Sequence, residues 1–69
     1  MAEVEDVLRR LAGRRVQLRC RDDVPYENPV IGHVERVTAG QVLIRVHPRR
    51  IDGIPIEDIV GVDVLTDDG

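Results

Sequence analysis

The chain has 69 residues with 13 acids and ten arginines, no lysine and no serine, and its formal net charge is −3. This length is close to the lower limit for one hydrophobic core, so a single domain over residues 1–69 is expected. Cys20 is the only cysteine, which excludes an internal disulfide and favours a reducing cytoplasm. No apolar run approaches the roughly 20 residues that span a bilayer, and the acidic N-terminal segment is unlike a signal peptide, so no membrane partner is expected.

Residues 3–12 are predicted to form an amphipathic helix. Acidic residues in the first turn and arginines in the last complement the helix dipole. Gly13 follows where a C-terminal cap favours positive φ. Because so short a helix is not stable alone, its apolar stripe must pack on the rest of the chain. This stripe has the spacing i, i+3, i+4, i+7 and consists of Val4, Val7, Leu8 and Leu11.

Five segments are predicted to be β-strands. The first and third alternate between apolar and polar residues, the period of a half-buried strand. Gly32 lies inside the second strand, where it predicts a bulge or a sharp bend. Residues 22–29 and 47–52 are expected to be loops, the latter with some strand-edge character. The expected strands are about 15–21, 30–37, 41–47, 53–56 and 59–65.

Two details of the C-terminal part follow from the same pattern. Glu57 and Asp58 predict a single 3₁₀ turn between the last two strands. Val60, Val62 and Val64 are expected on one face of the last strand, because alternate residues share a face. Residues 66–69 are expected to be a frayed acidic tail.

The order of these elements resembles that of Sm-like and SH3-like small barrels. The pattern Gly13-x-x-Val16-x-Leu18, followed by Gly32-x-Val34 and 42–44, resembles the first half of an Sm-like domain. Residues 54–62 are similar to the C-terminal domain of the bacterial ribosome maturation factor. The resemblance implies a mainly β fold, in which a short N-terminal α-helix precedes a five-stranded antiparallel SH3-like or Sm-like small barrel.

The chain departs from the Sm pattern at the residues that bind RNA in that family. The turn over residues 38–40 reads Thr-Ala-Gly, where Sm proteins have Asp and Asn. The arginine–glycine pair that Sm proteins carry near their fourth strand is also missing. The resemblance therefore implies a fold and transfers no RNA-binding residue to this chain.

The residue types argue against catalysis, cofactors and metal. Without serine, and without a Cys–His motif, the sequence offers no activated nucleophile. Adjacent carboxylates occur at 22–23, 57–58 and 67–68, and these are expected to be solvated charges. Cys20, His33 and His47 lack the spacing of a metal site. We therefore expect no enzyme activity, cofactor, metal or small-molecule substrate, with both histidines exposed or at the rim.

Arginines provide the candidate binding face. Three are predicted to point outward on strands and two lie in a loop, and together they could bind phosphate or carboxylate groups. Pairing with the acidic C-terminal segment is the favoured alternative. The five residues are Arg19, Arg21, Arg45, Arg49 and Arg50.

Tyr26 is the only aromatic residue, and it completes the candidate set. It could contact a peptide partner, although packing over the open end of the barrel is favoured. A single aromatic ring does not provide the stacking platform of single-strand binders.

Three functional hypotheses remain open at this point. The first is a non-enzymatic module that docks on a protein partner in a macromolecular assembly. The second is an RNA- or DNA-binding module that uses the arginine face; it is not favoured, because the protein is acidic. The third is a homo-oligomeric structural unit, since small cores often need a partner subunit.

Overall fold

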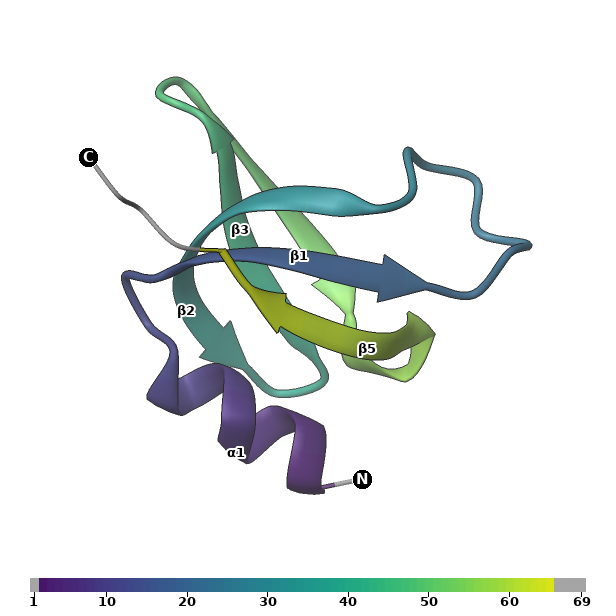
Figure 1. The fold of residues 1–69 in the computed structure, drawn as a ribbon, viewed down its shortest axis with the longest axis horizontal. Helices are drawn as coiled ribbons and strands as arrows, with labels where there is room; N and C mark the ends of the chain where they lie inside the picture. The colour runs from purple at the N-terminus through teal and green to yellow at the C-terminus, as the bar shows by residue number, and fades with distance from the viewer. Residues whose placement is uncertain (1, 66–69) are drawn as a thin grey trace.

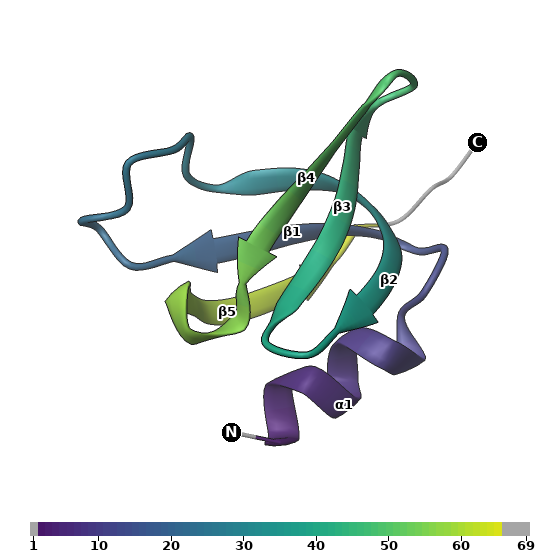
Figure 2. The same cartoon turned by 180° about the vertical axis from the view of Figure 1, so that it is seen from behind.

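The computed structural model describes residues 2–65; the acidic tail predicted at 66–69 lies outside them. One helix precedes five antiparallel strands, which form one sheet in the order β4-β3-β2-β1-β5 (Figures 1 and 2). This confirms the mainly β fold class. β4 and β5 are the two edges and are connected through a 3₁₀ turn, η1. The elements are α1 (Ala2–Arg10), β1 (Arg15–Cys20), β2 (Val30–Thr38), β3 (Gln41–His47), β4 (Arg50–Pro55), η1 (Ile56–Asp58) and β5 (Ile59–Val64).

Helix α1 ends two residues earlier than the sequence predicts, and its apolar stripe is narrower. Leu8 is completely buried, whereas Val7 is 42% exposed. The chain leaves the helix through tight turns, and Gly13 has the expected positive φ of +83°. The amide of Gly13 donates to the carbonyl of Val34 at 2.7 Å, which joins the end of the helix to β2. This helix is not long and apolar enough to cross a membrane.

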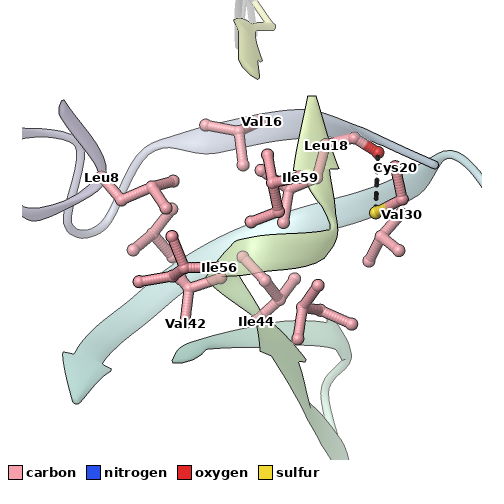
Figure 3. Packing of buried hydrophobic residues seen from close by; sticks show 11 residues of the cluster. Leu8, Val16, Leu18, Cys20, Val30, Val42, Ile44, Ile56 and Ile59 are labelled. Carbon is pink, nitrogen blue, oxygen red and sulfur yellow. Dashed lines mark hydrogen bonds between the residues drawn. The ribbon is translucent and has the colours of Figure 1, made fainter. Parts of the chain in front are cut away.

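The core lies inside the bent sheet, with α1 over one end. Leu8 enters it from the helix, and Ile56 and Ile59 enter it around η1 (Figure 3). β-branched residues suit this packing because their stiff side chains fit a pleated surface. The buried members are Leu8, Val16, Leu18, Cys20, Val30, Val34, Val42, Ile44, Ile54, Ile56 and Ile59.

Gly32 allows β2 to pass close to β3. A Cβ atom at this position would lie 2.5 Å from the carbonyl oxygen of Arg45 and 2.6 Å from Cγ2 of Ile44. Both distances are too short for any side chain. β2 curves strongly as it crosses the molecule (Figure 2). The close approach explains why glycine stands at position 32, whereas the register shift of β2 against β3 lies further along, between Val34 and Arg36.

The sequence prediction was wrong about the start of β4. Residues 47–52 were expected to be a loop or a strand edge, with the strand itself from about 53, but only Pro48 and Arg49 form the turn and β4 begins at Arg50. His47 and Arg50 are Cα partners at the end of the hairpin. Most residues of β4 are exposed or half-buried. An edge strand of this kind carries little apolar alternation, so periodicity does not reveal it.

The predicted face of β5 was wrong at Val60 only. Val62 and Val64 are the Cα partners of the buried Leu18 and Val16 and so share one face, whereas Val60 is 64% exposed and Ile59 is buried. The cause is a register shift opposite Arg19 and Cys20, where Arg19 pairs with Gly61 but Cys20 pairs with Ile59. The extra residue in this bulge is Val60, which turns outward.

Candidate functional site

The strands that carry Arg19 and Arg45 are not neighbours, because β2 lies between β1 and β3, and four of the five candidate arginines have acidic partners. Nε of Arg19 donates to Oδ2 of Asp63 at 2.9 Å, and its guanidinium covers Gly61 on β5. Nε of Arg50 donates to Oδ1 of Asp52 at 3.0 Å. The pairing with the acidic C-terminal segment that the sequence favours therefore holds for Arg19.

Arg21 also pairs with an acid, and this acid, Asp58, is buried. Its Nη2 donates to Oδ1 of Asp58 at 2.7 Å, and its backbone amide donates to the Asp58 carbonyl at 2.9 Å. Asp58 is only 7% exposed. The expectation that the carboxylates at 57–58 are solvated charges was wrong for Asp58. The turn η1 directs this side chain inward, and its second oxygen, Oδ2, accepts a 2.8 Å hydrogen bond from the hydroxyl of Tyr26.

Tyr26 is thereby fixed at the end of the sheet. Its ring packs against the core, as the favoured interpretation predicted. Burial, with the hydrogen bond to Asp58 as the next cause, raises the pKa of the phenol above its ordinary value. The neighbouring thiol of Cys20 is 5% exposed, and burial raises its pKa as well.

The loop that carries Tyr26 is held at its far end by Asn28. The Asn28 side chain accepts from the amide of Cys20 at 3.0 Å and donates to the Cys20 carbonyl at 2.9 Å. It also donates to the carbonyl of Arg21 at 3.1 Å. An amide side chain can satisfy a strand end in this way because it carries both donor and acceptor. The loop is thus fixed at two points, Tyr26 and Asn28.

Arg45 belongs to a different part of the surface. Its Nε donates to Oε2 of Glu35 at 2.7 Å, and its Nη1 donates to the carbonyl of Pro48 at 2.7 Å. The hydrogen bond from Arg45 lowers the pKa of Glu35. These contacts connect β3 to β2 and to the hairpin turn.

Tyr26 and two of the arginines meet in a hollow of about 490 Å³, which we call the loop–hairpin hollow. It is lined by residues of the β1–β2 loop, of β2 and of the β3–β4 hairpin; the loop and the tip of the hairpin extend in different directions from the sheet (Figure 1). Its apolar lining consists of Pro29, Val30, Ile31, Val46 and Ile54. Its polar lining consists of Tyr26, Glu27, His47, Arg49, Arg50 and Asp52. Arg49 is exposed and forms no ion pair with an acid among residues 2–65.

A second hollow, of about 580 Å³, adjoins the first, and we call it the basic hollow. The two share Ile31, Val46 and His47. The basic hollow adds Arg15, Gly32, His33, Arg45 and Pro48, and none of its lining residues is acidic. Within residues 2–65, no three His, Cys, Asp or Glu side chains gather as a metal site would require.

Of the candidate residues, Tyr26, Arg49 and Arg50 line the loop–hairpin hollow, whereas Ile31, which lines both hollows, was not among the candidates. Ile31 is 41% exposed and follows the buried Val30 in β2. Only the pairing of β2 with its neighbouring strands shows that the Ile31 side chain lies on the outer face of the sheet. Asp58 was missed because adjacent acids in a turn normally face solvent.

Compared with protein-family models, with curated proteins and with solved structures, the chain matches none of them. The shape of the two hollows and the residues that line them are therefore the basis for a functional assignment.

Proposed function

We propose that this protein is a non-enzymatic interaction module of the SH3-like or Sm-like small-barrel type, which docks on a protein partner through the loop–hairpin hollow. The occupant is an extended partner segment that carries an apolar side chain close to an acidic one. The observation that carries the proposal is the convergence of Tyr26, Arg49 and an apolar floor from segments that are distant in sequence. The strand order and the η1 turn support the fold type.

The chemistry of the hollow supports a peptide rather than a nucleic acid. Ile31 and Val46 offer apolar surface for a side-chain anchor, and specific peptide sites combine such surface with a few placed polar groups. Arg49 can pair with a carboxylate at the rim, because no described acid holds it. Nucleic-acid binding through the candidate arginines is less well supported, because Arg19, Arg21, Arg45 and Arg50 all have acidic partners that compete with phosphates.

The hollow is also rigid enough to select a partner. Tyr26 is fixed by its hydrogen bond to Asp58, and Asn28 binds the end of β1. On the opposite wall, Arg45 holds the carbonyl of Pro48 in the hairpin turn. Walls that are ordered before binding lower the entropic cost of association.

The test is selection of a random-peptide display library on the protein, followed by affinity measurement of the enriched peptides. Ile31→Gln and Arg49→Gln should each weaken binding by about tenfold, the value of one lost anchor or charged contact. Ile51→Gln is the matched control, because Ile51 is 45% exposed on β4 but lines neither hollow. Enriched peptides that bind all variants equally, or no enrichment at all, would refute the proposal.

Self-association is a second candidate, favoured by the two open sheet edges. β4 and β5 each have one unpaired side, and they carry the exposed Ile51, Val60 and Val64. Such edges invite pairing with another chain. The bulge at Val60 weakens the case for β5, because bulges interrupt a regular ladder. Sedimentation at millimolar concentration decides this candidate: a monomer excludes it, and a concentration-dependent dimer supports it.

A further inference from the structure

We propose that the basic hollow binds an anionic group, a carboxylate or a phosphoryl group, carried by the same partner segment that occupies the loop–hairpin hollow. The inference that a peptide partner carries the anion rests on the proposed function, whereas the presence of an anion site in the basic hollow does not. The structural basis is a row of basic side chains across three strands. Arg15 is the Cα partner of His33, and His33 is the Cα partner of Arg45.

This row is unusual in a sheet. Residues directly opposite on adjacent strands have Cβ atoms about 4.5–5.5 Å apart, so Arg15 and Arg45 each lie next to His33. A chain that places Arg15 and Arg45 on either side of His33 therefore concentrates positive charge at one point. His47 and Pro48 extend the same hollow from the hairpin. An anion bound between Arg15 and Arg45 would accept charge-assisted hydrogen bonds, and its binding would stabilise the fold.

Internal neutralisation of this row is only partial. Glu35 holds Arg45 through a 2.7 Å hydrogen bond from Nε. Arg15 is exposed and has no acidic partner among the described residues. Although the whole chain carries a net charge of −3, the lining of this hollow within residues 2–65 includes two arginines and no acid. The hollow is thus a local exception to the acidic character of the protein.

The shared residues make one partner able to use both hollows. Ile31, Val46 and His47 line each of them, so a segment that places an apolar side chain on Ile31 can reach the basic hollow with a nearby residue. Because successive side chains of an extended segment point to opposite sides, the residue that reaches the basic hollow lies two positions from the anchor. A partner with its acidic or phosphorylated residue close to the apolar anchor fits this arrangement.

The anion site is tested first with inorganic phosphate alone, at constant ionic strength so that general screening does not change. Backbone resonances of His33, Arg45 and His47 should shift saturably. Arg15→Gln should weaken this binding by about tenfold, as expected for one charge-assisted contact. Arg10→Gln is the control, because it removes an exposed arginine in the last turn of α1, outside both hollows. Shifts that do not saturate, or that are equal in Arg15→Gln, would overturn the site.

A second series identifies what carries the anion. Peptides enriched on the protein are compared with versions in which the acidic residue is Ala, Asp or phosphoserine. A loss with Ala that is restored by Asp or phosphoserine, and that depends on Arg15, supports the inference. Arg49→Gln separates the two proposals: it should weaken the peptides but leave phosphate binding unchanged. Peptide binding that does not depend on Arg15 would leave the proposed function standing and overturn this inference. Arg15-dependent binding of a single-stranded oligonucleotide, with no peptide binding, would overturn both the proposed function and the assignment of the anion to a peptide.

Discussion

The hydroxyl of Tyr26 donates a 2.8 Å hydrogen bond to Oδ2 of Asp58, while Oδ1 of the same carboxylate accepts from Arg21 at 2.7 Å. One buried acid thus joins the β1–β2 loop, the end of β1 and the turn η1. The loop forms one wall of the loop–hairpin hollow, so the geometry of the proposed binding site depends on this carboxylate.

Asp58→Ala should lower the free energy of unfolding by about 2 kcal/mol. Removal of a buried charged acceptor leaves its donors without a partner, although Arg21, half exposed, recovers part of the loss from water. The matched control is Asp63→Ala, whose ion pair with Arg19 is about half exposed and should contribute less than about 1 kcal/mol. Urea unfolding measures both. Equal effects for the two variants would contradict the structural role of Asp58.

Alkaline titration should show a tyrosine that resists ionisation. Tyr26 is the only tyrosine and the chain has no tryptophan, so phenolate absorbance reports on this residue alone. Its raised pKa means that the fold stabilises the neutral form. That stabilisation is complete below the ordinary pKa of 10.0 and is lost as the pH rises above it. We expect little phenolate at pH 10 in the folded protein, and stability that falls at higher pH.

Asp58→Asn is the informative variant for this titration, because the Asp58 carboxylate contributes to the shift. The variant should ionise closer to the ordinary value. Half-ionisation at pH 10 in the unchanged protein would show that Tyr26 is not held as described.

Features of the fold that depend on local sequence were predicted, whereas features that depend on contacts between distant segments were not. The helix and the strands β1 and β3 depend on local periodicity, so the sequence located them to within one or two residues. The exposed β4 has no such period, and the outward turn of Val60 depends on a bulge against β1. The start of β4 and the orientation of Val60 both depend on pairing with strands that are distant in sequence. The same holds for the candidate site. The sequence identifies the arginines as candidates, but only the three-dimensional structure shows which of them form ion pairs with acidic residues.

Gly32→Ala should destabilise the protein by about 3 kcal/mol, near the upper end of the usual cost of overpacking. The new methyl group would overlap the Arg45 carbonyl oxygen, a backbone atom that cannot move freely. Gly53→Ala is the control, since the nearest atom there is Oε1 of the flexible Gln41 side chain at 2.8 Å. Thermal unfolding should separate the two variants clearly. A small effect at Gly32 would mean that β2 does not approach β3 this closely.

The thiol of Cys20 should react slowly in the folded protein. It is 5% exposed and its pKa is raised by burial, so little accessible thiolate exists near neutral pH. A small domain with about 3–5 kcal/mol of stability should label at least about 100-fold more slowly than the urea-unfolded chain. An aromatic disulfide reagent measures both rates. Similar rates would place Cys20 outside the core.

The most direct test of the proposed function is the position of a bound peptide on the protein. An enriched peptide is titrated into isotope-labelled protein, and the backbone resonances that shift are mapped onto the structure. We expect the shifts to cluster at Ile31, Val46, His47 and Arg49, around the two hollows. Shifts confined to β4 and β5 would instead indicate pairing at the sheet edges and would contradict docking in the loop–hairpin hollow.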